Sequence, residues 1–432
     1  MLKLKIFGFL FCCGSLISNS IDAIASESEK NDSDSTVYNR VFFEKITLSN
    51  KFYSEGAGVG DFNRDGYKDV VIGAQWYEGP DFKRKHEYRP IKEFDPAEYS
   101  ETFYLYGKDI NGDGWDDILA IDIPGKPAAW YENPKGKEGH WKRIEVVPWV
   151  GNESPGLDTV VGDERPELLF NTDGYLGYAE IDWENPYKEW KFHKISTAKG
   201  AFFIYTHGLG VGDINGDGRK DFVESMGWWE QPETLDKGTA WKFHRFHFTD
   251  GGAQMIVTDV NEDGLNDIIT VWHPHKYGLV WWEQTRSEGK IDFIKHILTG
   301  EKESDSPYGV KFSQAHALAL VDIDGDGLED IVTGKRWWAH RPPIDPDSDA
   351  PAVLYWFKKV RNKDGTIDFI PFLIDDDSGV GTQITIEDLN GDSSPDIVIG
   401  NKKGEFIFLS KREKVTKEEW EKYCPVKKEV MN

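Results

Sequence analysis

One nine-residue pattern recurs six times in this chain and constrains its fold more than any other feature. Asp stands at positions one, five and nine, Asn or Asp at position three, and Gly or Ser at position six. The copies are Asp61, Asn63, Asp65 and Asp69; Asp109, Asn111, Asp113 and Asp117; Asp213, Asn215, Asp217 and Asp221; Asp259, Asn261, Asp263 and Asp267; Asp322, Asp324, Asp326 and Asp330; and Asp388, Asn390, Asp392 and Asp396. Alternating oxygen ligands on a tight loop suit a hard cation, so we expect up to six structural Ca²⁺ sites.

The residues that follow each loop exclude an EF-hand. An EF-hand requires a bidentate Glu at position twelve and a helix on either side. In three of the loops position twelve is Ile72, Ala120 or Thr333, and each loop leads into an apolar, strand-like run such as Val70–Ile72. The sequence therefore predicts calcium loops within β-hairpins.

The number of repeats predicts the architecture. The interval between Asp109 and Asp213 is about twice as long as the others and contains a decayed copy, Thr159–Glu167, that has lost its first two ligands. This makes seven units. A strand-like segment ends each unit, at Tyr88–Phe94, Trp141–Val147, Trp190–Ile195, Trp241–Phe248, Ile291–Leu298 and Ile367–Ile374, with the seventh at the N-terminus, Val41–Leu48. We expect an all-β, seven-bladed β-propeller with four-stranded blades, in which the N-terminal strand closes the last blade.

A third repeat, Trp-(Tyr/Trp)-Glu-x-Pro, occurs at Trp76–Pro80, Trp130–Pro134 and Trp228–Pro232. These Trp residues could be sugar-stacking platforms, but packing between blades is the more common role for aromatic side chains in such a fold. We therefore expect most of them in the core.

The termini define the expected domain organisation. Residues 1–25 resemble a secretory signal, with Lys3 and Lys5 before an apolar run and Ala23–Ala25 as a cleavage site. A polar linker spans 26–36, the propeller 37–410 and a charged tail 411–432. Cys12 and Cys13 raise a lipoprotein as the less favoured alternative. We expect a secreted or periplasmic protein in which Cys424 is the only cysteine after cleavage, so bound metal rather than a disulfide stabilises the fold.

The charge and hydropathy of the chain restrict the classes of partner that it can bind. The formal net charge is −25, which argues against nucleic acid because phosphate binding needs a basic face. Apart from the N-terminal segment, no stretch approaches the length of a membrane span. We expect a polysaccharide or sugar partner; the sequence does not indicate the oligomeric state.

Aligning the units on the first calcium ligand predicts where a site could form. If the calcium loops lie at one face, the residues six before that ligand and fourteen after it lie at the opposite face, near the axis. The first column is Glu55, Phe103, Glu153, His207, Ala253, His316 and Thr382; the second is Gln75, Ile123, Asp173, Gly227, His273, Arg336 and Lys402. His207, His273 and His316 stand in these columns, and His275 and His340 lie in the lengthened loops His273–Gly278 and Ala339–Asp349 that follow the second column, so all five map to one face.

The chemistry of that face suggests an acid–base site. The candidate catalytic residues are His207, His316, Arg336, His273 and Tyr277, and the candidate substrate-binding residues are Gln75, His275, His340, Arg341 and Tyr205. Histidine can take a proton next to a carboxylate or carbonyl, a cation or metal can stabilise the enolate-like charge, and Tyr or a second His can protonate the leaving oxygen. For each single histidine a structural role is the alternative, and for Arg336 and Arg341 a solvated rim charge.

Segments such as His207–Gly218 (HGLGVGDINGDG) resemble the FG-GAP/VCBS repeats of integrin-α-type propellers over residues 37–410. The stretch from His316 to His340 is similar to secreted propellers related to the propeller half of aldos-2-ulose dehydratase. Seven-bladed propellers also occur among polysaccharide lyases of the ulvan lyase type. The resemblance implies acid–base roles for His207 and His316 and a uronate-binding role for Arg336.

Three hypotheses follow. The first is a lyase that cleaves a uronate-containing, ulvan-like polysaccharide by β-elimination. The second keeps the chemistry but changes the substrate to a small keto sugar, as in a dehydratase. The third is a non-catalytic, calcium-dependent carbohydrate-binding or adhesion propeller, which predicts glycan binding that survives loss of His207 and His316.

Overall fold

The structure is a computed structural model that describes residues 38–197, 199–235 and 240–428. The expected signal segment 1–25 and linker 26–36 lie outside the described residues. Within residues 38–428 the chain is almost entirely β, which confirms the all-β prediction. The one α-helix of these residues, α1 (Lys417–Tyr423), follows the last strand, and a 3₁₀ turn, η1 (Glu303–Asp305), interrupts one loop.

The described strands form six sheets, of which five have four antiparallel strands. These contain β2 (Ala57–Gly60), β3 (Asp69–Ile72), β4 (Gln75–Tyr77) and β5 (Lys85–Glu87); β13 (Leu209–Gly212), β14 (Asp221–Glu224), β15 (Gly227–Glu230) and β16 (Lys242–Arg245); β17 (Ile256–Thr258), β18 (Asp267–Val271), β19 (Leu279–Ser287) and β20 (Lys290–Thr299); β21 (Leu318–Val321), β22 (Asp330–Gly334), β23 (Leu354–Arg361) and β24 (Ile367–Asp375); and β25 (Thr385–Glu387), β26 (Asp396–Asn401), β27 (Gly404–Val415) and β1 (Tyr38–Ser49).

The sixth sheet has seven strands because two units share one long strand. It contains β6 (Thr102–Lys108), β7 (Asp117–Asp122), β8 (Lys126–Glu132), β9 (Lys142–Asp158), β10 (Glu167–Thr172), β11 (Tyr175–Glu180) and β12 (Lys191–Lys194). The first part of β9 pairs with β8, from Lys142 to Val150, and the second part pairs with β10, from Gly151 to Asp158. The chain thus passes from one unit to the next without leaving the extended conformation.

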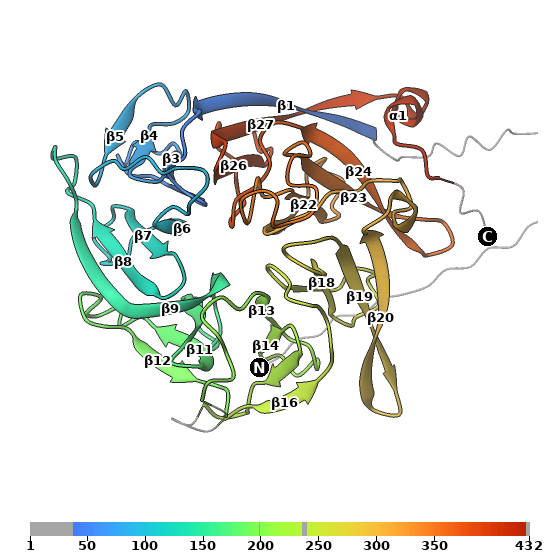
Figure 1. The fold of residues 1–432 in the computed structure, drawn as a ribbon, viewed down its shortest axis with the longest axis horizontal. Coiled ribbons are helices and arrows are strands. Elements are labelled where there is room, and N and C mark those ends of the chain that lie inside the picture. The colour runs from blue at the N-terminus through green and yellow to red at the C-terminus, as the bar shows by residue number, and fades with distance from the viewer. Residues whose placement is uncertain (1–37, 198, 236–239, 429–432) are drawn as a thin grey trace, which may run out of the picture. The chain divides into compact units, whose positions relative to one another are not determined.

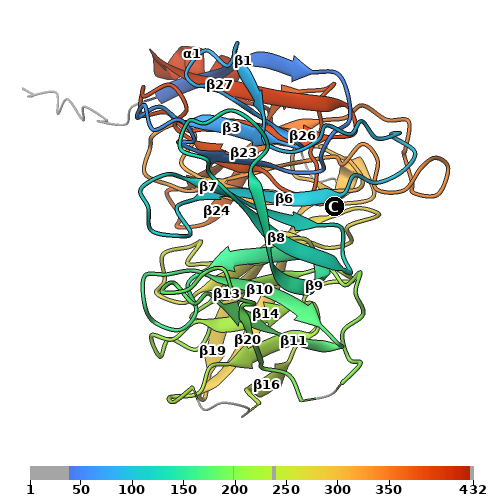
Figure 2. The same ribbon diagram turned by 90° about the vertical axis from the view of Figure 1, so that its left-hand side faces the viewer.

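The two ends of the described chain meet in one sheet. β1 runs antiparallel to β27, from Tyr38 opposite Val415 to Ser49 opposite Glu405, and the two strands lie side by side in both views (Figures 1 and 2). Strand β27 continues past Ser410, where we expected the tail to begin. The helix α1 then packs its buried Trp420 against this sheet.

The sheets follow one another in chain order around the middle of Figure 1, and their first strands contact each other. Strand β2 contacts β6 and β25, β13 contacts β9 and β17, and β21 contacts β25. The hydrophobic clusters lie between neighbouring sheets; one joins Val71 and Trp76 to Leu105 and Tyr131. Trp76, Trp130, Trp228 and Trp281 are all buried, as the packing interpretation of the Trp repeat requires.

The expected outer strands lie close to their predicted places, with one exception. The segment Tyr88–Phe94 is not a strand; the strand of that unit is β5, which ends at Glu87. Tyr88 instead donates its backbone N–H to the Ala74 carbonyl and its hydroxyl to the Gly73 carbonyl. Pro90 has no N–H to continue a ladder, which explains why pairing stops there.

Among the described residues, no helix combines the length and apolar character needed to cross a bilayer.

Candidate metal centre and active site

Three imidazoles meet where three sheets begin or turn. His207 precedes β13, His316 precedes β21, and His275 lies in the loop between β18 and β19. The ring centroids of His207 and His275 are 5.0 Å apart, those of His207 and His316 5.4 Å, and those of His275 and His316 4.8 Å. One nitrogen from each ring lies within 4.8 Å of the others.

Each of these histidines has a buried nitrogen without a hydrogen-bond partner: His207 Nε2, His275 Nδ1 and His316 Nε2. Buried polar atoms are normally hydrogen-bonded, and three exceptions in one place call for an explanation. Three imidazole nitrogens with a fourth position left open are the ligand set of a catalytic zinc site. The donors therefore fit a divalent transition metal.

The protonation states suit such a site. Burial, with Arg336 and the neighbouring imidazoles, holds the pKa of His316 well below its usual value. Burial also lowers the pKa of His275, although Asp345 opposes the shift. Both rings are thus neutral near neutral pH and have a lone pair to offer a metal.

A buried charge network lies beneath the imidazoles. Glu153 Oε2 lies 3.4 Å from His207 Nε2, without hydrogen-bond geometry, and 3.4 Å from Arg336 Nη1. Burial opposes ionisation of Glu153, but His207 and Arg336 outweigh it and lower its pKa to about 2. Arg336 also pairs with Glu55 and is only 1% exposed. Its charge is therefore already neutralised inside the protein.

A cavity of about 430 Å³ opens above this cluster. The residues that line it are Tyr99, Phe103, Ile123, Glu153, Tyr205, His207, His275 and His340. His340 stacks on His275, with ring centroids 4.4 Å apart, and its Nδ1 lies 3.1 Å from Asp345 Oδ1. A carboxylate only accepts, so Nδ1 carries the proton and Nε2 is left as an acceptor.

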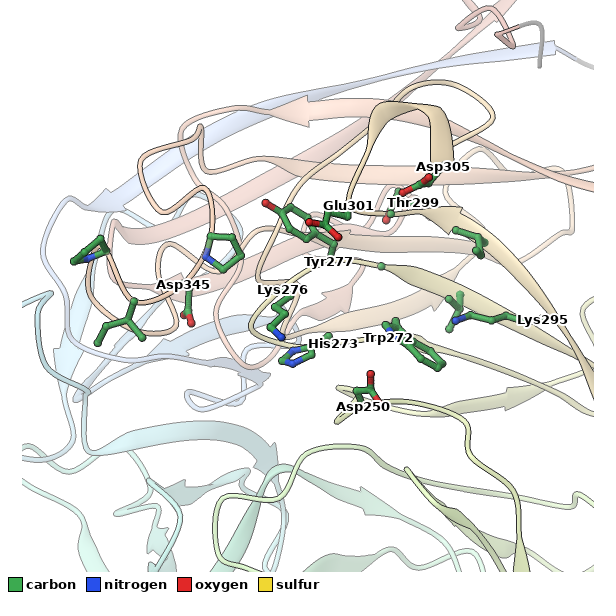
Figure 3. Close-up of a pocket in the computed structure, with 17 residues that line it drawn as sticks. Asp250, Trp272, His273, Lys276, Tyr277, Lys295, Thr299, Glu301, Asp305 and Asp345 are labelled. Carbon is green, nitrogen blue, oxygen red and sulfur yellow. The ribbon is translucent and has the colours of Figure 1, made fainter. Parts of the chain in front are cut away.

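A second hollow of about 730 Å³ is shown in Figure 3, and one of its lining residues, Asp345, contacts His340 of the first cavity. His273 and Tyr277 line this hollow and not the cavity of about 430 Å³ beside the three histidines. Tyr277 donates its hydroxyl to Asp347. The ring of His273 is 6.3 Å from that of His275, and burial lowers its pKa. The two residues therefore neighbour the three-histidine cluster without belonging to it.

The remaining predicted residues divide into two groups. The structure brings His207, His275, His340 and Tyr205 together around one cavity, and His316 lies next to His207 and His275. Gln75 is buried in β4 and Arg341 is exposed, and neither is among the described residues that line the two hollows. Arg336 is buried below the cavity, so the rim-charge alternative for it is wrong.

Sequence reasoning did not select Glu153, Asp345 or Tyr99. Glu153 stands in the same repeat column as His207 and His316, and that position was the available signal. Asp345 lies in the long connection between β22 and β23, where no repeat applies. Tyr99 precedes β6, and its ring lies 4.4 Å from the Lys402 ammonium.

The predicted calcium loops connect the first and second strands of their units, at the far end of the first strand from the histidines. In the first loop, Asp61 accepts the N–H groups of Asp65 and Gly66. Position six adopts a left-handed conformation, with φ of +89° at Gly66 and +65° at Ser393. This left-handed conformation explains why Gly is the usual residue at position six, with Ser in one loop.

The last Asp of each loop is a buried bridge between strands. The carboxylate of Asp69 accepts the N–H groups of Phe62 and Gly79, and the other loops repeat this arrangement with Asp117, Asp221, Asp267, Asp330 and Asp396. In the decayed copy Glu167 accepts the N–H of Val160. The decayed copy has thus lost its first two ligands but keeps a carboxylate at the last position, where it accepts a backbone N–H.

The fifth loop has an internal cation. Among the described loops it is the one that brings three carboxylates, Asp322, Asp324 and Asp330, within 4.8 Å of one another. The buried Lys358 ammonium pairs there with Asp324 and Asp326. A lysine therefore already balances part of the charge that calcium would balance.

Four other histidines have structural surroundings. His86, His244 and His296 stack on Trp76, Trp228 and Trp281, and His193 stacks on Tyr178. Each also pairs through Nε2 with a glutamate of its own sheet. These positions belong to the outer strands and are distinct from the cluster.

No family model matches the chain, and no curated protein matches it. Among solved structures, an Agrocybe aegerita lectin that recognises non-reducing terminal N-acetylglucosamine aligns with a TM-score of 0.41 at 14% identity, over 78% of this chain and 81% of the lectin. The V. cholerae biofilm matrix protein Bap1 aligns with a TM-score of 0.40 at 10% identity, over 89% and 92% of the two chains. Rhamnogalacturonan lyase YesW aligns with a TM-score of 0.39 at 13% identity, over 85% and 75%. At these values the likenesses carry no argument about function.

Proposed function

We propose that this protein is a metal-dependent carbohydrate lyase that cleaves a uronate-containing polysaccharide, such as ulvan, by β-elimination. The observation that carries the proposal is the convergence of three imidazoles, His207, His275 and His316, two of which line a cavity. Each has a buried nitrogen without a hydrogen bond, although Glu153 lies 3.4 Å from His207 Nε2 and Asp345 3.7 Å from His275 Nδ1.

The roles differ from those expected for the residues singly. A divalent metal held by the three imidazoles would neutralise the substrate carboxylate and stabilise the charge that develops on it. Arg336 cannot take this role, because Glu55 and Glu153 already pair with it below the cavity. It holds Glu153 beside His207 instead.

His340 is placed to act as the general base. Asp345 fixes its tautomer, so Nε2 can accept the proton from the carbon next to the uronate carboxylate. The C–O bond to the leaving sugar then breaks as the double bond forms, and a proton passes to the leaving oxygen. Tyr99 and Tyr205 line the same cavity and are the candidate donors.

We further propose that the scaffold is a calcium-stabilised, seven-bladed propeller of the FG-GAP/VCBS type in a secreted or periplasmic protein. Treating the two parts of β9 as strands of different units gives seven four-stranded units. The contacts between first strands and the pairing of β1 with β27 support a closed ring.

A small keto sugar is the second candidate substrate. The cavity of about 430 Å³ is of a size to hold a single sugar ring. The same residues could then remove a proton next to a carbonyl and expel a hydroxyl. A binding or adhesion module stays the non-catalytic alternative. It gives no function to the buried histidine nitrogens that lack a hydrogen bond.

The test combines metal analysis with activity. The purified protein should contain a transition metal, and incubation with ulvan, pectin or gum arabic should raise the ultraviolet absorbance of an unsaturated uronate. Substitutions His207→Ala, His275→Ala and His316→Ala should each lose the metal and the activity. His244→Ala is the matched control, because His244 stacks on Trp228 in an outer strand. Activity of a metal-free protein, or silence on every polymer and keto sugar, would refute the proposal.

A further inference from the structure

The hollow beside the metal centre has the features of a binding site in its own right. It measures about 730 Å³, which is within the range of ligand sites, and it is lined by residues from β19, β20 and four loops. His273 and Lys276 lie between Asp345 and Trp272 in the view of Figure 3. Asp345 lines this hollow and contacts His340, which lines the cavity beside the three histidines, so these two residues separate the two spaces there.

Two lysines line this hollow without an acidic partner. Among the described residues, no ion pair involves Lys276 or Lys295; the ammonium of Lys295 lies 3.1 Å from the centroid of the Trp272 ring. Burial lowers the pKa of Lys295, which shows that this ammonium is partly removed from water. Such a group gains most from an anionic ligand.

The acidic groups of the hollow are largely engaged elsewhere. Asp250 pairs with His247 and Asp345 with His340, while Asp305 accepts the backbone N–H of Lys302 and Glu301 also lines the hollow. The floor between them is apolar, with Ile297 and Ile344 both substantially exposed. The C–H faces of a sugar ring could pack on the apolar side chains of this hollow, and its anionic substituents could pair with the lysines.

We propose that this hollow is a second sugar subsite, which binds an anionic residue of the same glycan next to the one held at the metal centre, with its carboxylate or sulfate paired to Lys276 and Lys295. The inference rests on the proposed lyase function. It makes an oligosaccharide, not a monosaccharide, the preferred substrate, because only a chain can occupy both spaces.

The test compares chain lengths and lysine variants. Ulvan oligosaccharides of two, four and six sugars, native and desulfated, are titrated calorimetrically into the full-length metal-loaded protein and assayed for cleavage. We expect Lys276→Gln to raise KM and Kd about two- to fivefold on the longer chains, the loss of one exposed ion pair, and to leave kcat and the disaccharide unchanged. If desulfated chains bind as tightly as native chains, the lysines pair with the carboxylate. If desulfated chains bind more weakly, the lysines pair with sulfate.

Two controls keep the outcomes separable. Lys290→Gln changes an exposed lysine of the same strand β20 that does not line the hollow, and it should have no effect. Lys295→Gln tests the second cation, with its thermal unfolding measured because Lys295 also contacts Trp272.

Chains that bind through Lys276 without being cleaved would support the subsite and refute the lyase. Cleavage that is indifferent to chain length and to both lysines would overturn the subsite and leave the lyase standing. Absence of both binding and cleavage would overturn both.

Discussion

Arg336 and Glu55 form a buried ion pair, with Nη2 3.1 Å from Oε1, although 281 positions separate them in the chain. Glu55 is fully buried and Arg336 is 1% exposed. Glu55 precedes β2, the first strand of its sheet, and Arg336 follows β22, the second strand of another sheet. The pair therefore links distant parts of the fold directly beneath the candidate metal centre.

We expect Arg336→Met to destabilise the protein by about 3–5 kcal/mol, because it leaves Glu55 and Glu153 buried without a counter-charge. Chemical denaturation measures this. The double variant Arg336→Met/Glu55→Gln should recover part of the loss, since one of the unpaired charges is removed. Unchanged stability together with lost activity would mean that Arg336 acts on substrate.

His340→Ala should lower kcat about 10²- to 10⁴-fold, the usual contribution of a general base, and leave the bound metal and KM nearly unchanged. Asp345→Asn should act in the same direction, because it removes the group that fixes the His340 tautomer. His296→Ala, which stacks on Trp281 in an outer position, is the control. Loss of metal in His340→Ala would instead make this residue part of the ligand set.

Chelation should lower the melting temperature strongly, because cations that bind only the folded state stabilise it by mass action. The fifth loop is expected to depend least on calcium, since the Lys358 ammonium already pairs with Asp324 and Asp326. Lys358→Met should therefore destabilise the chelated protein and add one calcium equivalent in titration calorimetry. A melting curve indifferent to chelation would contradict calcium binding altogether.

Glu405 should make stability depend on pH. Burial raises its pKa from 4.5 to about 7, against the opposing hydrogen bond from Tyr77. The folded state thus keeps a proton that the unfolded chain has already lost, so the free energy of unfolding falls as pH rises between these values. Below the unfolded pKa the penalty is absent, and above the folded pKa it is constant. The loss amounts to about 3 kcal/mol.

Replacing Glu405 by Gln removes this titration. The free energies of unfolding of the wild type and Glu405→Gln should therefore diverge by about 3 kcal/mol between about pH 5 and about pH 8. Glu413→Gln is the control, because Glu413 forms an exposed pair with Arg40. Parallel pH profiles for wild type and Glu405→Gln would show that the buried carboxyl is ionised throughout.

Some of the site was accessible from the repeats. The column six residues before the first loop ligand contains Glu55, Glu153, His207 and His316, and the structure places all four in one network. His275 and His340 were assigned to the same face through the lengthened loops. Asp345 could not be found this way, because no repeat register extends into an irregular connection.

The roles of individual residues were harder to predict. His86 and His207 are the same residue type, yet one stacks on Trp76 and the other leaves a buried nitrogen unpartnered. We expected Arg336 to bind the substrate, but two carboxylates from other units form ion pairs with it instead. Partners supplied from distant segments decide such roles.

The sequence by itself determined the β-hairpin units, their loops and the pairing partner of the N-terminal strand, because each depends on local patterns of apolar, acidic and glycine residues repeated along the chain. Only the tertiary structure decided that the three imidazoles of His207, His275 and His316 lie together while others stack on tryptophans, and that a lysine enters the fifth loop. Those outcomes depend on which side chains come into contact across different sheets. A local sequence pattern does not determine contacts between segments that are far apart in the chain.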